Sequence, residues 1–441
     1  MIMPQPSPPV IDILRLNTCG SVDDGKSTLI GRLLYDSKSL MDDQVEALER
    51  SADITGGGQI NLANLTDGLR AEREQGITID VAYRYFATPR RKFIIADTPG
   101  HVQYTRNMVT GASNSNLSIV LVDARLGVIE QSRRHTAIAS LLRIPHLVVA
   151  INKMDLVGWS KERYDEIREQ FEEFLPRLDI KDVKFIPLSA LNGDNVVDPS
   201  PHTPWYVGPT LLGHLETVHI ASDWNLDAFR LAVQWVNRPN NPTDPRLHDF
   251  RGFSGQIGRG IVRVGQKVMA LPGGVVSTVK EINTFDGPVA EAFCPQSVTL
   301  VLEHDIDVSR GSMLVGLENL PGGATDLRAK ICWLHPRALQ RGRKYFLKHT
   351  TSTVQAMVTE IEHRLDMATL EEQPAPAELA MNDLGEIRLR TAKPIYYDGY
   401  AANRLTGSFI LIEQGTNATV GAGMLLPPTE VVRPESTDYT I

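Results

Sequence analysis

Cysteine is scarce in this chain of 441 residues, and its three copies lie far apart. Cys19, Cys294 and Cys332 fit neither a disulfide framework nor a zinc-binding pattern, so a reducing compartment is expected. The chain also lacks an apolar run of membrane-spanning length. Its first ten residues are rich in proline and lack the basic and then apolar layout of a signal peptide. These absences predict a soluble, cytoplasmic protein that binds no membrane.

An excess of positive charge is missing as well. The 45 Lys and Arg residues stand against 53 Asp and Glu, and the formal net charge of −8 disfavours broad contact with nucleic acid. A hydrophobic content of 42% and a charged content of 22% are typical of a soluble globular protein. Because the length exceeds what one hydrophobic core organises, we expect two to four domains.

The strongest motif is a glycine-rich stretch near the N-terminus. Gly20, four further residues and Gly25-Lys26-Ser27 match the phosphate-loop pattern G-x-x-x-x-G-K-[ST] at every fixed position. Glycines let backbone N–H groups turn inward around phosphate oxygens, and the following helix adds its positive N-terminal end. Lys26 is expected to reach the terminal phosphates, and the Ser27 hydroxyl to bind magnesium. The residues predicted to contact a nucleotide here are Gly20, Ser21, Val22, Asp23, Asp24, Gly25, Lys26, Ser27 and Thr28.

The first half of the chain alternates short apolar runs with helical periodicity. Apolar strands separated by helices predict a mostly parallel sheet that is covered on both faces. The expected strands are 13–17, 83–87, 93–97, 118–123, 147–152 and 184–188, and the expected helices include 27–35, 130–143, 161–174 and 210–218. The long polar segment 36–82 suits a loop that senses the bound nucleotide.

After about residue 225 the helical rhythm gives way to short strands bounded by glycine, proline and aspartate turns. Such runs are expected at 230–236, 260–268, 297–303, 328–334, 353–362, 386–391 and 407–413. Their spacing predicts two antiparallel β-barrels behind the α/β phosphate-loop domain. The predicted domains are residues 1–220, 221–323 and 324–441.

A second motif, Asp97-Thr98-Pro99-Gly100, ends the strand expected at 93–97. Asp97 is expected to hold magnesium through water, and the Gly100 N–H to sense a third phosphate. Thr78 offers a further hydroxyl for magnesium, although its position also fits an ordinary strand residue. His101 follows Gly100, where it either orients an attacking water or caps the next helix at the surface.

Two further motifs point to the base of the nucleotide. Asn152-Lys153-Met154-Asp155 follows an apolar strand, and the Asp155 carboxylate can accept the N1 and N2 hydrogens of guanine, which adenine does not offer. Lys153 can lay its aliphatic stem along the base, and Asn152 can brace neighbouring loops. The alternative is a polar turn in which Asp155 caps the next helix. Ser189-Ala190-Leu191 ends the following strand, where the Ala190 N–H could bond the guanine carbonyl oxygen. Together these motifs predict GTP or GDP with Mg²⁺ as ligands.

The ordered set G-x-V-D-x-G-K-S-T, G-I-T-I-D, D-T-P-G-H and N-K-M-D resembles the translation-factor class of GTPases. Within that class, the stretches 20–36, 69–85, 92–105 and 146–157 are similar to the GTPase subunit of bacterial sulfate adenylyltransferase. Asp24 carries part of this resemblance, because elongation factors usually have histidine, serine or alanine there. The resemblance covers the phosphate-loop domain and, less sharply, the two barrels.

This resemblance implies that GTP hydrolysis here is coupled to formation of adenylyl sulfate and pyrophosphate from ATP and sulfate. The adenylyl transfer would occur on a small, ATP-binding partner subunit, in a heterodimer or an assembly of heterodimers. The chain has one phosphate loop, made guanine-specific by Asp155, which agrees with a second active site on another chain. Some relatives carry a C-terminal kinase for adenylyl sulfate, and nothing after Thr325 resembles one. The resemblance also implies the catalytic residues His101, Lys26, Thr78 and Gly100 and the magnesium ligands Ser27, Thr78 and Asp97.

A rival reading is an elongation- or release-factor-like GTPase that delivers RNA or a release factor, because such factors share the three-domain layout. The pair Asp23-Asp24 and the stretch 69–85 favour sulfate activation. A nucleotide-binding scaffold without hydrolysis is disfavoured by the intact set of Thr78, Gly100 and His101. Co-purification with a small ATP-pyrophosphatase-like subunit, or with RNA, separates the first two readings.

Overall fold

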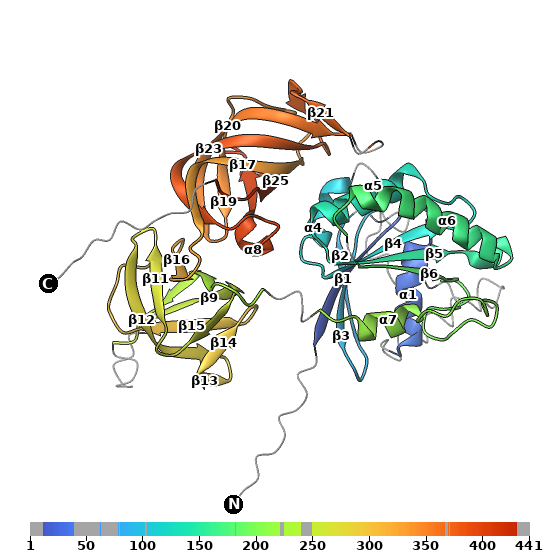
Figure 1. Cartoon of the computed structure of the whole chain (residues 1–441), viewed down its shortest axis with the longest axis horizontal. Coiled ribbons are helices and arrows are strands. Elements are labelled where there is room, and N and C mark those ends of the chain that lie inside the picture. The colour runs from blue at the N-terminus through green and yellow to red at the C-terminus, as the bar shows by residue number, and fades with distance from the viewer. Residues whose placement is uncertain are drawn as a thin grey trace, which may run out of the picture. The chain divides into compact units, whose positions relative to one another are not determined.

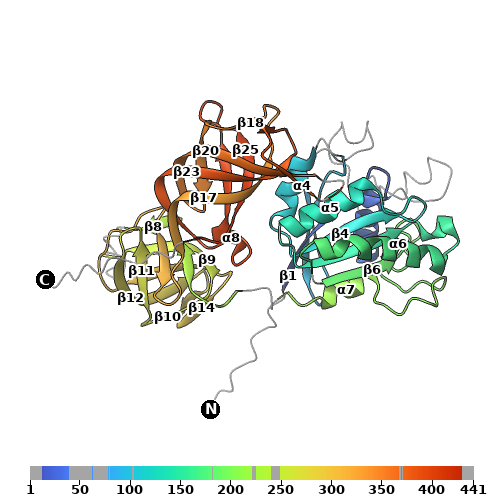
Figure 2. The same ribbon diagram turned by 45° about the horizontal axis from the view of Figure 1, so that its top comes forward.

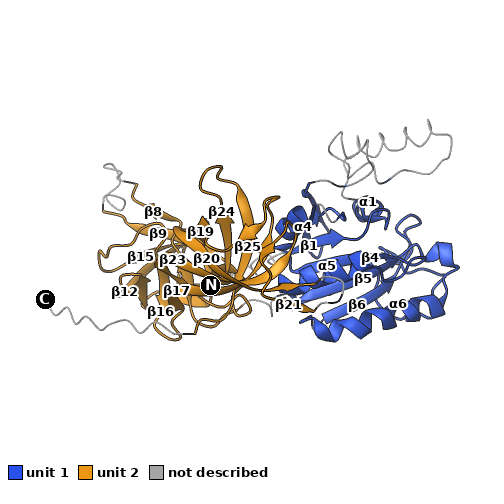
Figure 3. Cartoon of the chain, turned by 90° about the horizontal axis from the view of Figure 1, so that it is seen from above, with its two compact units in different colours: residues 1–220, 367–370 blue, residues 221–366, 371–441 orange. Residues whose placement is uncertain are grey.

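The computed structural model describes residues 12–38, 62, 78, 80–101, 104–180, 182–220, 225–239, 249–366, 369 and 371–429. The chain divides into two compact units, residues 1–220 with 367–370 and residues 221–366 with 371–441 (Figure 3). Among the described helices, none is both long enough and apolar enough to cross a membrane.

Unit 1 is built on a six-stranded sheet in the order β2-β3-β1-β4-β5-β6. All neighbouring strands are parallel except β2, which runs antiparallel to β3 at one edge. Every residue of β4 is buried, as expected for a central strand covered on both faces. The strands are β1 (Ile13–Cys19), β2 (Ala82–Ala87), β3 (Lys92–Asp97), β4 (Leu117–Asp123), β5 (His146–Asn152) and β6 (Asp182–Pro187).

Helices cover both faces of this sheet. Figure 1 shows α4 and α5 on one side of the sheet and α1 and α7 on the other, and Figure 2 shows α7 again on the side opposite α4 and α5. Leucine and isoleucine side chains of α1 and α7 share one hydrophobic core with apolar residues of β1, β3 and β4. The helices are α1 (Lys26–Asp36), α4 (Thr105–Ala112), α5 (Glu130–Leu141), α6 (Lys161–Phe174) and α7 (Leu211–Thr217), with short 3₁₀ turns η3 (Met154–Val157) and η4 (Leu175–Arg177).

The mostly parallel sheet predicted from the sequence is confirmed, with strand ends within two residues of the expected ones. Helix α4 was not among the expected elements. It is only eight residues long and contains Gly111, so it carries a weak periodic signal. Of the predicted sensing loop, residues 39–61, 63–77 and 79 lie outside the described part of the chain.

Unit 2 contains two antiparallel barrels, as predicted. The first closes in the order β11-β16-β7-β9-β15-β12 and back to β11, and the second in the order β19-β24-β25-β17-β23-β20 and back to β19. The first barrel has β7 (Arg230–Ala232), β8 (Trp235–Asn237), β9 (Gly252–Arg259), β10 (Ile261–Arg263), β11 (Lys267–Leu271), β12 (Val275–Thr284), β13 (Gly287–Val289), β14 (Glu291–Phe293), β15 (Ser297–Leu302) and β16 (Met313–Gly316). The second has β17 (Gly322–Trp333), β18 (Leu339–Gln340), β19 (Lys344–His349), β20 (Ser352–Leu365), β21 (Glu372–Pro374), β22 (Glu378–Leu379), β23 (Leu384–Tyr397), α8 (Arg404–Gly407), β24 (Ser408–Ile412) and β25 (Thr419–Leu425).

Several expected barrel strands are wrong in detail. The run 260–268 is not one strand, because a turn closed by the Gln266 N–H donating to the Arg263 carbonyl oxygen separates β10 from β11. The run 230–236 is split into β7 and β8, since Val233 donates to the Ser312 carbonyl and Gln234 to that of Ser254. Strand β17 begins at Gly322, two residues before the domain limit expected at 323/324, and that limit stays a prediction.

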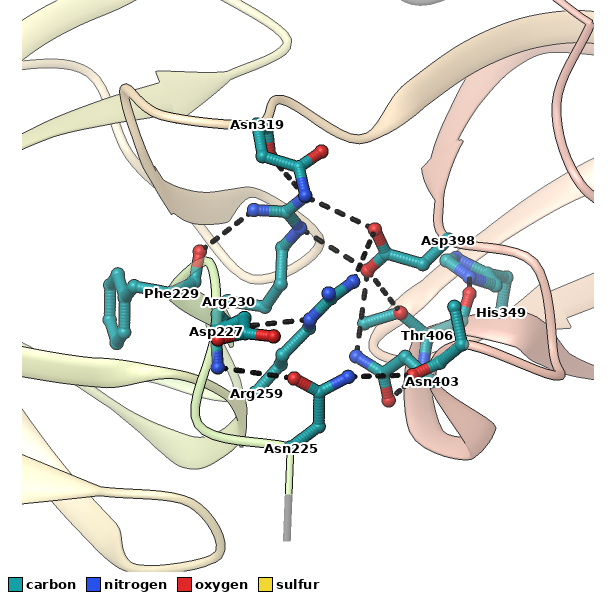
Figure 4. A network of polar contacts seen from close by, with 11 residues as sticks. Asn225, Asp227, Phe229, Arg230, Arg259, Asn319, His349, Asp398, Asn403 and Thr406 are labelled. Carbon is teal, nitrogen blue, oxygen red and sulfur yellow. Dashed lines mark hydrogen bonds and ion pairs between the residues drawn. The ribbon is translucent and has the colours of Figure 1, made fainter.

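A buried polar network joins the two barrels of unit 2 (Figure 4). Arg230 of β7 is fully buried and donates to both carboxylate oxygens of Asp398, at 3.2 and 3.1 Å. Arg259 lies 3.6 Å from the same carboxylate, and the Thr406 hydroxyl donates to it at 2.8 Å. One carboxylate is therefore the counter-charge of two arginines of the first barrel. Removing one member of such a buried pair typically costs about 3–5 kcal/mol, because the remaining charge is left buried without its partner.

Candidate functional site

The predicted site residues gather at the carboxyl edge of the unit 1 sheet. Most of them follow the ends of β1, β3, β5 and β6, and Thr78 precedes β2, whose first residue pairs with the last residue of β3 at the same edge. Open parallel sheets bind their ligands at this edge. The sequence motifs, which span residues 20–191, therefore lie together at one edge of the described part of unit 1.

The phosphate loop links β1 to α1. Gly25 precedes the helix with a left-handed backbone, φ 91°, and a β-carbon there would lie 2.4 Å from the Asn152 side-chain nitrogen. Glycine is thus required both by the turn and by the close approach of Asn152. Lys26 and Asp24 are buried, Gly20 is buried, and Ser21, Gly25, Ser27 and Thr28 are half-buried, whereas Val22 and Asp23 are exposed.

Lys26 is at the centre of a compact polar cluster. Its Nζ donates to the Thr78 hydroxyl at 2.9 Å and lies 3.6 Å from Asp97 Oδ1. All three side chains are at least 90% buried. Ser27 follows in the first turn of α1. Asp97 offers a carboxylate and Thr78 and Ser27 offer hydroxyls, the hard oxygen donors that Mg²⁺ prefers, so the chemistry of these residues fits the predicted ion.

The segment after β3 packs directly on the phosphate loop. A β-carbon on Gly100 would lie 2.0 Å from the Gly20 carbonyl oxygen, so only glycine fits. The Thr98 hydroxyl donates to the Thr18 carbonyl at 2.7 Å, and Pro99 is buried. These contacts fix the backbone around Gly100 against the loop. His101 follows with an exposed side chain whose ring lies 6.1 Å from that of Tyr104.

Asn152 ties three loops together. Its Nδ2 donates to the Asp24 carbonyl oxygen at 2.7 Å, and its Oδ1 accepts the Ala190 N–H at 2.9 Å. The predicted bracing role of Asn152 thus has a direct structural basis. The Ala190 N–H that donates to Asn152 is the group that was expected to donate to the guanine carbonyl oxygen. Its contact with guanine stays a prediction.

The other base-side residues differ in exposure. Met154, Ser189 and Ala190 are buried, and the Met154 N–H donates to the Leu188 carbonyl at 3.3 Å, so Met154 anchors its turn in the core. Lys153 and Asp155 are half-buried, and Leu191 is half exposed. Asp155 lies in the 3₁₀ turn η3. The next helix, α6, is capped by the Ser160 hydroxyl and not by Asp155. The capping alternative for Asp155 is therefore wrong.

Asp123 and Arg125 also belong to this edge of the sheet, although neither was predicted as a site residue. Asp123 ends β4, is 3% exposed, and lies 2.9 Å from Lys153 Nζ. Arg125 donates to both carboxylate oxygens of Asp123, with the shortest contact at 2.6 Å. The signal was available, because Asp123 ends an apolar strand in the same way as Asp97.

Two of the buried carboxylates near the phosphate loop, Asp24 and Asp123, have pKa values shifted in opposite directions. Burial raises the pKa of Asp24 to about 6, although its Oδ2 accepts the Ser21 N–H at 2.6 Å. Burial also acts to raise the pKa of Asp123, but hydrogen bonds from Arg125 and Lys153 outweigh it and leave that pKa at about 2. Burial raises the pKa of Cys19 to about 12, so this thiol stays protonated and unreactive.

The raised pKa of Asp24 gives a pH-dependent prediction. Because protonated Asp24 is favoured in the folded state, its contribution to stability is present below pH 4 and is lost as the pH rises to about 6. Over that range the loss approaches about 3 kcal/mol in the nucleotide-free chain. Asp24→Asn keeps an acceptor for Ser21 and removes the titration, so its melting temperature relative to the parent should rise between pH 4.5 and 7. A difference that is the same at both pH values would contradict the assignment.

Comparisons with known families agree with this arrangement. The family model described as the elongation factor Tu GTP binding domain matches residues 12–235, just over half of the chain. The model described as GTP-eEF1A C-terminal domain-like matches residues 326–426. Unit 1 is thus a GTP-binding domain of the elongation factor Tu type. Among solved structures, that of sup35 complexed with GDP is similar, with a match that covers 95% of each chain at 23% identity and a TM-score of 0.44.

Curated relatives extend the match to nearly the whole chain. Sulfate adenylyltransferase subunit 1 of Bacteroides fragilis (strain YCH46) is 55% identical over 421 residues, which are 95% of this chain and 87% of that protein. The same subunit of Colwellia psychrerythraea (strain 34H / ATCC BAA-681) is 50% identical and covered to 88%. The bifunctional enzyme CysN/CysC of Mycobacterium tuberculosis (strain ATCC 25618 / H37Rv) is 55% identical over 94% of this chain and 67% of its own length. The resemblance noted in the motifs is confirmed, and the chain belongs to the sulfate adenylyltransferase subunit 1 family.

Proposed function

We propose that this chain hydrolyses GTP and couples the hydrolysis to formation of adenylyl sulfate and pyrophosphate from ATP and sulfate on a small partner subunit. The observation that carries the proposal is the buried cluster of Lys26, Thr78 and Asp97. The loop 152–155, proposed to bind the base and called the base-recognition loop below, is joined to the phosphate loop by Asn152. The cluster occurs in a chain 55% identical to a sulfate adenylyltransferase subunit 1. Adenylyl sulfate contains a high-energy phosphate–sulfate anhydride, so its formation from ATP requires a second source of free energy.

The site residues divide the task between binding and hydrolysis. Lys26 and the loop amides from Gly20 to Thr28 would hold the phosphates and stabilise charge that develops on the transferred phosphoryl group. Asp155 would accept the two guanine hydrogens, with Lys153 along the base. His101 would orient the attacking water, and the Gly100 N–H would sense the third phosphate.

Magnesium would be held by the Ser27 and Thr78 hydroxyls, with Asp97 acting through water. When bound, it would neutralise charge on the second and third phosphates. In the structure, Lys26 lies against Thr78 and Asp97, so these residues already share one buried cluster. Binding of nucleotide would therefore redistribute existing partners rather than assemble the cluster from separate parts.

A partner-dependent GTPase rate tests the proposal. The purified chain should hydrolyse GTP at about 10⁻³–10⁻² per second, the range usual for such sites without a stimulating partner. Addition of the small subunit, then ATP, then sulfate should raise phosphate release, most with both substrates present. The Lys26→Ala variant, which is expected not to bind nucleotide, is the negative control for background phosphate release. A rate unmoved by the partner and its substrates but raised by ribosomes or tRNA would favour the translational reading instead.

A further inference from the structure

Asp123 is placed beside the base-recognition loop by the sheet itself. It pairs with Asn152 in the β4–β5 register, and the Ala124 N–H donates to the Asn152 carbonyl oxygen at 2.9 Å. Lys153 is the next residue and has a left-handed backbone, φ 63°. The turn returns its side chain over the end of β4, where Lys153 Nζ lies 2.9 Å from Asp123 Oδ2.

Lys153 also reaches the phosphate loop. Its Nζ donates to the Asp23 carbonyl oxygen, so a single ammonium group contacts the end of β4 and the loop after β1. Asp123 is the acidic member of this contact, and it is 3% exposed. Holding a lysine side chain in one conformation costs about 2 kcal/mol of rotamer entropy. A fixed counter-charge such as Asp123 offsets this cost.

Arg125 in turn fixes Asp123. Its side chain donates to both carboxylate oxygens and its backbone N–H donates to Oδ1 at 2.9 Å. Arg163 of α6 donates to the Ala124 and Arg125 carbonyl oxygens, at 2.7 and 3.1 Å, and so holds the turn that carries Arg125. The Asp123 carboxylate is therefore oriented before any ligand arrives.

We propose that Asp123 is a positioning residue for guanine-nucleotide binding: it holds the Lys153 ammonium between the base-recognition loop and the phosphate loop. The inference rests on the nucleotide site proposed above and adds to it a residue outside its motifs. Asp123 acts through Lys153 and does not itself touch the nucleotide. Because Lys153 is expected along the base and not at the third phosphate, GDP and GTP should be affected alike.

Pre-orientation predicts a kinetic effect. A ligand-contacting side chain that is held in place before binding loses less freedom on binding. Asp123→Asn keeps the shape of the side chain but removes the charge that retains Lys153. We expect GDP dissociation to become about 10- to 100-fold faster, by analogy with the loss of affinity when a group that orients a metal ligand is removed.

A double-mutant cycle separates positioning from a general structural role. GDP dissociation is measured with a fluorescent GDP analogue for the parent, Asp123→Asn, Lys153→Ala and the double variant. If Asp123 acts through Lys153, Asp123→Asn should change the rate less than twofold in the Lys153→Ala background. Asp182→Asn is the matched control, because Asp182 contacts His146 at 2.7 Å at the amino edge of the same sheet. It should dissociate GDP at the parental rate.

These measurements separate failure of the proposed nucleotide site from failure of the positioning role of Asp123. A parent that does not select GDP over ADP would overturn the proposed nucleotide site. A selective parent with an unchanged Asp123→Asn rate, or with the full effect retained without Lys153, would overturn only the positioning role. If Asp123→Asn does not fold, Arg125→Gln replaces it, since the Arg125 side chain is 49% exposed. This variant should speed GDP release in the parent and not in the Lys153→Ala background, and any other pattern contradicts the proposal.

Discussion

The Asp155→Asn variant is expected to lose most of its affinity for GTP and to gain affinity for XTP. The Asp155 carboxylate accepts hydrogens from N1 and N2 of guanine in the proposed site, and an amide replaces one acceptor with a donor. Loss of a bidentate charged contact should cost about 2–5 kcal/mol of binding. Xanthine carries an oxygen where guanine has its amino group, so it matches the amide.

Dissociation constants for GTP and XTP measure this exchange. Asp165→Asn is a suitable control, because Asp165 pairs with Lys161 on the exposed face of α6, two elements removed from β5. It should bind GTP as the parent does. Unchanged GTP affinity in Asp155→Asn would remove Asp155 from base recognition.

The His101→Ala variant should bind GTP with nearly parental affinity and hydrolyse it at least about 10²-fold more slowly, as expected for a group that orients the attacking water. The His101 side chain is exposed, so its truncation to alanine removes no core contact. Lys26→Ala provides the contrast. Lys26 is buried against Thr78 and Asp97, and its removal takes away a contact made in both ground and transition states, so nucleotide binding itself should fail.

Equilibrium binding and single-turnover hydrolysis, measured on both variants, separate the two roles. A parental hydrolysis rate for His101→Ala would show that this histidine is only a surface residue. Retained GTP affinity in Lys26→Ala would place the phosphates elsewhere.

The nucleotide-binding domain could be predicted closely because its signals are local. Buried parallel strands such as β4 appear as continuous apolar runs, and each motif directly follows one of them. What could not be predicted is how the motifs share their donors. The Ala190 N–H is used by Asn152, a contact between residues 38 positions apart that no local pattern encodes.

The first barrel was harder to predict because several of its strands are only three residues long. Strand β9 contains three glycines, and Leu231 and Leu405 pack against two of them, Gly255 and Gly258, so it lacks the full apolar alternation that marks a strand in the sequence. Arg230 is a sharper case. A fully buried arginine is intelligible only with Asp398, which lies 168 positions away in the other barrel.

The central claim is that GTP spent on this chain drives adenylyl transfer on its partner. Its most direct test is the amount of pyrophosphate formed from ATP and sulfate by the complex of the two subunits, with GTP, without GTP, and with the Lys26→Ala chain. The account predicts that pyrophosphate accumulates in step with GTP hydrolysed, and that it stays at a low equilibrium level in the other two reactions. Equal yields of pyrophosphate in all three reactions would contradict it.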